Sequence, residues 1–123
     1  MNIVIIGCGY VGCAVAEYWQ QNSALNITVT TTTPERVSKL DSISKKVIVT
    51  KGDDLLGLQA ATENQDVVLL TVGSKGGSSY QETYLNTAHN LVSVLQRNPT
   101  VKQLIYTSTY SIYGNQNGAW VDE

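Results

Sequence analysis

The chain has 123 residues, which is enough for one domain with its own hydrophobic core but too few for two full domains. Hydrophobic residues make up 42% of it and charged residues 15%, and the net charge is -2. No basic excess is present to neutralise a phosphate backbone, so we expect no binding of nucleic acid. No stretch approaches the roughly eighteen apolar residues that a membrane span needs.

The first residues could be mistaken for an export signal. Residues 3–16 are largely apolar and end in Ala-Val-Ala, which is similar to a signal-peptide cleavage site. No Lys or Arg precedes Arg36, however, and three glycines interrupt the apolar run. Cys8 and Cys13 match no metal or redox spacing, and we interpret both as small buried hydrophobic residues. These features favour an unexported protein in a reducing cytoplasm.

The first half of the chain alternates strand and helix patterns. Residues 3–6 are apolar at every position, which is typical of a parallel strand covered on both faces. A helix should follow to about residue 22, because apolar residues recur at helical spacing (Val11, Val15, Tyr18 and Trp19). Residues 27–32 are β-branched throughout and predict a second strand. Thr33-Pro34-Glu35 predicts a helix start with a capping hydroxyl, a first-turn proline and an acid.

The second half repeats the alternation. Strands are predicted at residues 47–50, 67–72 and 103–107, and a short helix at about 54–62. Residues 73–79 predict a mobile loop, which could act as a lid. The clearest helix follows, with an expected apolar stripe of Tyr84, Leu85, Ala88, Leu91, Val92 and Leu95, and residues 98–99 end it. Asn117-Gly118 predicts a tight turn.

Strands separated by helices predict an α/β fold. Such a series forms a parallel sheet with right-handed crossovers and helices on both faces. We expect a doubly wound (Rossmann) sheet of five strands in the order 3-2-1-4-5, formed by residues 1–123 as a single domain. The ligand cleft of this fold lies at the carboxyl ends of the strands, where the order reverses between strands 1 and 4.

The strongest short motif follows the first strand. Gly7, Gly9 and Gly12 form G-x-G-x-x-G between a strand and a helix, the context that a dinucleotide site requires. Gly7 permits the tight turn, Gly9 lets the backbone approach a pyrophosphate, and Gly12 lets the helix pack against the sheet. Free N–H groups at the helix start, around Tyr10 and Val11, would hold the negative charge. The alternative is a glycine-rich turn without a ligand.

The end of the second strand bears on cofactor choice. A site that prefers NAD usually carries Asp or Glu about twenty residues after the glycines. Here residues 30–33 are all threonine, Thr32 included, and Arg36 lies just beyond, where it could pair with a 2′-phosphate. NADP is therefore favoured over NAD. Alternatively, the threonines serve only the strand and the next helix, and Arg36 is a solvated surface charge.

Other polar residues fall near the same edge of the sheet. Asp53 could accept a hydrogen bond from the adenine amine, or it could cap the next helix, as Asp54 could. Residues 71–73 (Thr71, Val72 and Gly73) end the fourth strand and should border the nicotinamide. The 75–77 segment has the wrong order for a nucleoside-triphosphate loop. His89 lies off its helix's apolar stripe and is interpreted as exposed rather than catalytic.

Residues 105–114, Ile-Tyr-Thr-Ser-Thr-Tyr-Ser-Ile-Tyr-Gly, strengthen this interpretation. Together with the glycine motif, Gly52-Asp53, the helix that carries Asn86 and the closing residues 120–123, they resemble the NAD(P)-dependent epimerase/dehydratase family of extended short-chain dehydrogenase/reductases. The resemblance covers essentially the whole chain. The glycine motif departs from that family's commoner threonine-led form, which implies an atypical subgroup.

The resemblance implies roles for residues near the end of the chain. Thr109 would hydrogen-bond the substrate oxygen that undergoes hydride transfer, and Ser108 and Tyr113 would border the substrate. In such enzymes a tyrosine, acidified by a lysine four residues later, acts as acid and base further along the chain. None of the seven tyrosines here has that lysine, and the last lysine is Lys102.

We therefore expect the cofactor-binding, N-terminal portion of a longer epimerase, dehydratase or reductase, with a nucleotide-sugar-like substrate and no turnover alone. A sheet that ends after five strands could expose apolar surface, so a homo-oligomer is a further expectation. The alternative is a non-catalytic NAD(H)-sensing regulatory domain, although such domains usually carry an acid after strand 2. A methyltransferase would want glycine in place of Val11.

Overall fold

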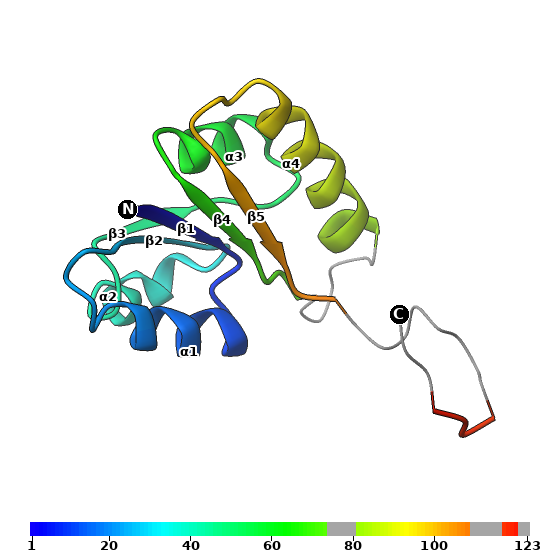
Figure 1. Cartoon of the computed structure of the whole chain (residues 1–123), viewed down its shortest axis with the longest axis horizontal. Coiled ribbons are helices and arrows are strands. Elements are labelled where there is room, and N and C mark those ends of the chain that lie inside the picture. Colours follow the sequence, from blue (N-terminus) through cyan, green and yellow to red (C-terminus); the bar gives the residue numbers. More distant parts are fainter. Residues whose placement is uncertain (74–80, 109–116, 121–123) are drawn as a thin grey trace.

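The computed structural model describes residues 1–73, 81–108 and 117–120. Five strands alternate with helices along the chain (Figure 1), and a 3-10 turn (η1) leads into α2 and a π-helical turn (η2) into α4. In chain order the elements are β1 (Asn2–Ile6), α1 (Tyr10–Trp19), β2 (Asn26–Thr31), η1 (Pro34–Arg36), α2 (Val37–Leu40), β3 (Lys46–Val49), α3 (Leu55–Thr62), β4 (Val67–Leu70), η2 (Gln81–Leu85), α4 (Asn86–Gln96) and β5 (Gln103–Tyr106).

The strands form one parallel sheet in the order β3-β2-β1-β4-β5, as predicted. Helices α1 and α2 lie on one side of the sheet and α3 and α4 on the other (Figure 1). The chain leaves β1 in one direction to β2 and returns on the other side as β4. The order therefore reverses between β1 and β4, and the carboxyl ends of these neighbouring strands diverge to leave room for a ligand.

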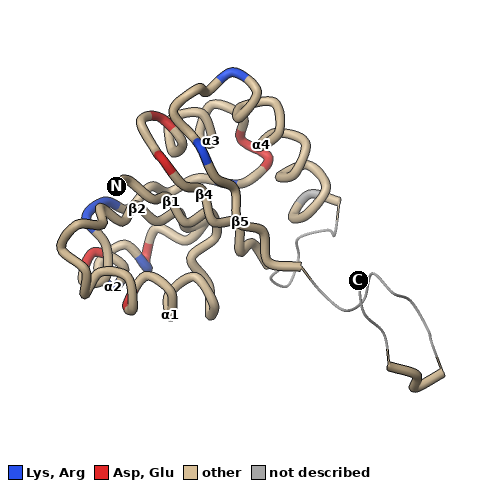
Figure 2. The backbone as a smooth tube through the Cα atoms, in the orientation of Figure 1, with Lys and Arg blue, Asp and Glu red and all other residues tan. Residues whose placement is uncertain are grey.

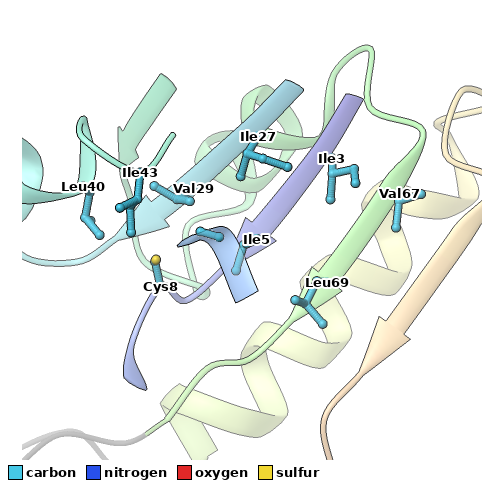
Figure 3. Close-up of a cluster of buried hydrophobic side chains, with 10 residues drawn as sticks. Ile3, Ile5, Cys8, Ile27, Val29, Leu40, Ile43, Val67 and Leu69 are labelled. Carbon is cyan, nitrogen blue, oxygen red and sulfur yellow. The ribbon is translucent and has the colours of Figure 1, made fainter. Parts of the chain in front are cut away.

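The alternation of side chains along β1 builds two cores. Ile3 and Ile5 pack with residues of α1, α2, β2 and β4 on one face, as the close-up of this cluster shows (Figure 3). Val4 and Ile6 point to the opposite face, where they meet Leu58 of α3 and other apolar residues of that side. These four apolar side chains of β1 are buried, as expected for a strand covered on both faces.

Two details at the end of β2 differ from the sequence interpretation. The Thr33 hydroxyl makes no capping hydrogen bond, and the first turn is a 3-10 turn that begins with Pro34. The Thr33 N–H instead donates to the Thr31 hydroxyl at 3.2 Å. β-Branched residues here therefore serve the loop as well as the strand.

The apolar stripe of α4 also differs from the prediction. Leu85 and Val92 are 45% and 52% exposed, whereas Thr87 and Val94 are buried. The buried face of α4 thus follows Thr87, Leu91 and Val94, with Leu95 packed beside it, and shares only Leu91 and Leu95 with the predicted stripe. His89 is exposed, as predicted. The predicted loop at 73–79 lies outside the described residues after Gly73.

Strand β5 differs from the other strands in exposure. All four of its residues are exposed, including Leu104 at 46% and Tyr106 at 59%. The strands β1, β2 and β4 are buried almost throughout. An outer strand whose apolar side chains face solvent leaves one edge of the sheet uncovered by the parts of the chain that the structure describes.

Charged residues are distributed over several elements (Figure 2). Basic and acidic positions both occur on each side of the sheet within the described ranges. Across residues 1–73, 81–108 and 117–120, no helix is both long and apolar enough to cross a membrane. The electrostatic features of interest are therefore local ones at the carboxyl edge of the sheet.

Candidate functional site

A cleft of about 580 Å3 opens at the carboxyl ends of the strands. Segments that follow all five strands contribute to its wall, as the doubly wound topology requires. Its lining residues are Gly7, Cys8, Gly9, Tyr10, Val11, Thr31, Thr32, Arg36, Lys51, Gly52, Asp53, Thr71, Val72, Gly73, Thr83, Thr87 and Thr107.

The turn after β1 depends on glycine at position 7. Gly7 has a φ of +86°, in the left-handed region that favours glycine. A Cβ atom there would lie 2.8 Å from the Cα and a side-chain carbon of Val72. The loops after β1 and β4 therefore pack backbone to backbone, which only a residue without a side chain permits.

One hydroxyl group from β2 and one from the loop after β4 hold this turn. The Gly7 N–H donates to the Thr30 hydroxyl at 2.9 Å, and the Thr71 hydroxyl donates to the Gly7 carbonyl at 2.7 Å. The Cys8 N–H also donates to the Thr30 carbonyl at 2.8 Å. Both polar groups of Gly7 are thus paired within the protein, and the turn is fixed before any ligand arrives.

The polar groups of the glycine turn are paired, but the first N–H groups of α1 have no side-chain cap. Its N-cap residue is Gly9, which has no side chain to accept from the first helical N–H groups, and the first turn contains no acid. A Cβ at Gly9 would meet no atom within 4 Å. The first N–H groups of a helix have no partner inside the helix. At α1 they lie beside the cleft, where Tyr10 and Val11 form part of the wall.

Gly12 serves packing rather than the cleft wall. A Cβ there would lie 2.9 Å from the Thr71 hydroxyl and 3.0 Å from the Gly7 carbonyl. A larger residue would push α1 away from the sheet and break the bond that Thr71 makes with Gly7. This is the helix-packing role that the sequence motif predicts for the third glycine.

Arg36 lines the cleft on the β2 side and is half-buried. Its Nη1 donates to the Cys8 carbonyl at 2.7 Å, and its Nη2 donates to the Cys13 sulfur at 3.3 Å. The guanidinium is therefore tied to the glycine turn, and it is not the freely solvated charge considered as the alternative. A charged group held at the wall of a cleft is available to an anion.

Cys8 and Cys13 lie next to each other beneath this turn. Their sulfur atoms are 3.3 Å apart, and Cys8 is buried whereas Cys13 is half-buried. Burial first, and the hydrogen bond to Cys13 second, raise the pKa of the Cys8 thiol from 9.0 to about 12. Cys8 therefore keeps its proton at neutral pH and acts as a small buried residue with a weak donor, in agreement with the sequence interpretation.

The β3 side of the cleft combines both charges. Lys51, Gly52 and Asp53 line it, and Asn90 of α4 donates to the Gly52 carbonyl at 3.1 Å. The neighbouring Asp54 accepts from the Gly57 N–H at 3.0 Å and is the N-cap of α3. The cap role, which the sequence left open between the two acids, therefore belongs to Asp54, and Asp53 is among the residues that line the cleft.

The structure brings most of the predicted cofactor residues together. Gly7, Gly9, Tyr10, Val11, Thr32, Arg36, Asp53, Thr71, Val72 and Gly73 all line the cleft, and Gly12 lies behind it. The predicted fourth strand ends earlier than expected, so the last three of these residues form a loop. Ser108 is exposed and is not part of the lining, while Thr109 and Tyr113 lie outside the described residues.

Several lining residues were not found from the sequence. Lys51 precedes Gly52-Asp53 directly, so its position after a strand was a usable signal. Thr83 and Thr87 are four residues apart and therefore share a helix face, but they interrupt an apolar pattern and gave no functional signal. Thr107 lines the cleft because its N–H and hydroxyl both bond the Leu70 carbonyl, a contact between strand ends.

A family model described as the NADP-binding domain of saccharopine dehydrogenase matches residues 3–102. A search of curated proteins found no match. Among solved structures, a mutant UDP-glucuronic acid 4-epimerase from Bacillus cereus, in complex with NAD and UDP-4-deoxy-4-fluoro-glucuronic acid, aligns over 100% of this chain and 45% of its own, with 21% identity and a TM-score of 0.77.

Two further solved structures are similar. Vestitone reductase from alfalfa (Medicago sativa) has 20% identity and a TM-score of 0.73, over 89% of this chain and 36% of its own. Apo saccharopine dehydrogenase (L-Glu forming) from Saccharomyces cerevisiae has 22% identity and a TM-score of 0.66, over 89% and 22%.

The chain spans less than half the length of these solved structures. At such identities the likeness establishes the fold. The resemblance to epimerases and short-chain dehydrogenase/reductases is confirmed at that level, whereas the matching family model is one that the sequence motifs did not indicate.

Proposed function

This chain belongs to the family of saccharopine dehydrogenase NADP-binding domains and is thus an NAD(P)-binding Rossmann domain. We propose that it is the cofactor-binding portion of an oxidoreductase or epimerase. In this proposal the cleft holds the dinucleotide, with its pyrophosphate at the start of α1. Hydride transfer then takes place between the nicotinamide and a hydroxyl-bearing substrate, for which we favour a nucleotide sugar or a similar molecule.

The start of α1 is the observation that carries the proposal. Its first N–H groups have no side-chain cap, and the position of Gly9 leaves open space where a side chain would project. A helix start with free donors favours a negative group through direct hydrogen bonds and through the helix dipole. The oxygen atoms of a pyrophosphate would accept hydrogen bonds from these N–H groups, for which no side chain of the cap residue provides an acceptor.

The charges at the cleft support NADP over NAD. Arg36 and Lys51 line the β2 and β3 side of the cleft together with Asp53, and the four threonines at residues 30–33 place no carboxylate at the end of β2. An acid at this point would repel a 2′-phosphate, whereas a guanidinium can bind it with two parallel hydrogen bonds. The name of the family model agrees with NADP, although the similar epimerase structure contains NAD.

The proposed chemistry needs residues beyond the cofactor cleft. By resemblance, Thr109 would orient the reacting oxygen, with Ser108 and Tyr113 beside the substrate. A phenol with an ordinary pKa near 10 needs a nearby cation to act as acid and base at neutral pH. Since no tyrosine here has a lysine four residues later, we propose that residues 1–123 bind the cofactor and turn nothing over alone.

The exposed strand β5 supports the proposal that this domain is part of a larger unit. Leu104, Ile105 and Tyr106 present 46%, 37% and 59% of their surface to solvent. Burial of such apolar area is favourable by about 25 cal/mol per Å2. Further chain of the same enzyme would cover this edge in the proposed arrangement, and a second copy of the domain would be the alternative cover.

Titration calorimetry of residues 1–123 with NADPH, NADH and S-adenosylmethionine tests the proposal. We expect NADPH to bind more tightly than NADH, and S-adenosylmethionine not to bind. Addition of UDP-glucuronic acid and oxidised cofactor should produce no reduced nicotinamide. Absence of binding by both dinucleotides would refute the cofactor site, and turnover would refute the need for further residues.

The solved structures named above are a reductase, a dehydrogenase and an epimerase, so the comparisons do not favour a non-catalytic sensing domain.

A further inference from the structure

The side chain of Arg36 is anchored at two points. Nη1 donates to the carbonyl of Cys8 at 2.7 Å, and Nη2 donates to the sulfur of Cys13 at 3.3 Å. A guanidinium has five N–H donors, so these two bonds leave three for a ligand. The group is half-buried and forms part of the cleft wall. It therefore combines a fixed orientation with free donors.

The two thiols complete a small network around this guanidinium. The Cys13 thiol donates to the Cys8 carbonyl at 3.5 Å, which uses its single proton. In the contact between the sulfur atoms, at 3.3 Å, Cys8 is then the donor and Cys13 the acceptor. The sulfur of Cys13 thus accepts from Cys8 and from Arg36 at once. Loss of this sulfur would release one of the two anchors of Arg36.

The anchors connect two parts of the cleft. Cys8 lies within the glycine turn after β1, and Arg36 follows β2. Cys13 is the fourth residue of α1. A long arginine side chain loses conformational entropy when it binds an anion. This entropy cost of binding is smaller if the protein already holds the side chain in the bound orientation. Loss of the Cys13 thiol should therefore weaken binding only of the ligand group that contacts Arg36.

We propose that Cys13 is a positioning residue that orients Arg36 for the 2′-phosphate of NADP, so that this thiol helps to set the preference for NADPH over NADH. The inference rests on the proposed dinucleotide site and adds a specificity role for Cys13. The residue does not touch the cofactor itself, and its contribution passes through the guanidinium.

The test compares Cys13→Ala with Cys13→Ser by calorimetry with NADPH and NADH. Alanine removes the acceptor, whereas serine keeps one. We expect Cys13→Ala to lower the ratio of NADPH to NADH affinity by about three- to tenfold, the effect of losing one ordinary hydrogen bond, because a thiol sulfur is only a weak acceptor, and Cys13→Ser to restore most of it. The urea midpoint of each variant confirms that it is folded.

A double-mutant cycle provides the control. In an Arg36→Ala background, Cys13→Ala should leave the affinity ratio unchanged, because the group that it orients is gone. In a Lys51→Ala background, which removes another cation of the cleft wall, Cys13→Ala should keep its full effect.

Equal losses of NADPH and NADH affinity in Cys13→Ala would overturn the inference, because a merely structural residue would act on both. An unchanged ratio, a failure of serine to restore it, or an undiminished effect without Arg36 would also overturn it. If the unsubstituted chain binds neither dinucleotide, the proposed function fails as well; if it binds both and only the Cys13 results disagree, the proposed function stands.

Discussion

The starts of α1 and α3 lie at the same edge of the sheet but are built differently. Helix α3 is closed by its own sequence, because the Asp54 carboxylate accepts from the Gly57 N–H. Helix α1 begins after Gly9 and has neither a side-chain cap nor an acid in its first turn. Both loops border the same cleft.

This difference separates stability from ligand binding. A capped helix start contributes about 1 kcal/mol to the free energy of unfolding, and an uncapped one forgoes that contribution. At α1 the unpaired donors face the cleft, so an external anion can make the bonds instead. The helix start that lacks a side-chain cap and borders the cleft is thus the place where we propose that the pyrophosphate binds.

The largest expected effect is that of Gly7→Ala on stability. Alanine would have to adopt a φ of +86°, and its Cβ would lie 2.8 Å from the Val72 backbone. Strain and overpacking together should lower the free energy of unfolding by about 2 to 5 kcal/mol. Urea denaturation followed by circular dichroism measures this. A loss below about 1 kcal/mol would contradict the close packing of the two loops.

Gly9→Ala should behave in the opposite way. No atom lies within 4 Å of the added Cβ, and the φ of -91° lies outside the left-handed region, so stability should change by less than about 0.5 kcal/mol. Dinucleotide affinity should fall about tenfold or more, because the methyl group would occupy the approach of the pyrophosphate. Calorimetry with NADPH checks this, and unchanged affinity would place the pyrophosphate elsewhere.

Alkaline pH should act on the α1 loop through Cys8. Its folded-state pKa is raised from 9.0 to about 12, by burial first and by Cys13 second. Below about pH 9 the contribution of the thiol to stability is complete. As the pH rises from 9 towards 12, the unfolded chain loses this proton first, and stability falls by about 1 to 2 kcal/mol at pH 10.

The measurement for this effect is the urea midpoint at about pH 8 and pH 10, in the unsubstituted chain and in Cys8→Ala. Other groups titrate over the same range in both proteins, so the readout is the difference between their pH-dependent losses. An equal loss in the two would show that Cys8 contributes nothing to the alkaline sensitivity.

The smallest expected effect is at the capped helix. Asp54→Ala should lower the free energy of unfolding by about 1 kcal/mol through loss of the bond to Gly57. Affinity for NADPH should stay within about twofold, whereas Asp54→Asn, which retains an acceptor, should recover most of the stability. A large loss of affinity in Asp54→Ala would remove the distinction between the two helix starts.

The fold was accessible from the sequence because its signals are local. The apolar runs of the strands, the glycines that follow the first strand and the proline at position 34 each predict the structure of only a few adjacent residues. In a βαβ series these local signals restrict the sheet to few topologies, and the observed order is the predicted one. The predicted stripe of α4 was only partly right, because hydrophobic spacing gives no reason to expect that Thr87 is buried or that Val92 is exposed.

Most of the cleft wall was also predictable, since the motif and the strand ends place residues at one edge. The pairing of Arg36 with Cys8 and Cys13 was not, because it joins positions 28 and 23 residues apart whose contact depends on the path of the chain after β2. Likewise, Asp53 and Asp54 are chemically identical neighbours, and only the direction of α3 distinguishes the residue that caps it.

The sequence alone thus determined the order of the strands and the glycine turn, because periodicity and backbone freedom are properties of short segments. The tertiary structure decided which polar groups are paired and which are left for a ligand. That outcome depends on side chains brought together from different strands, and no short segment contains the information.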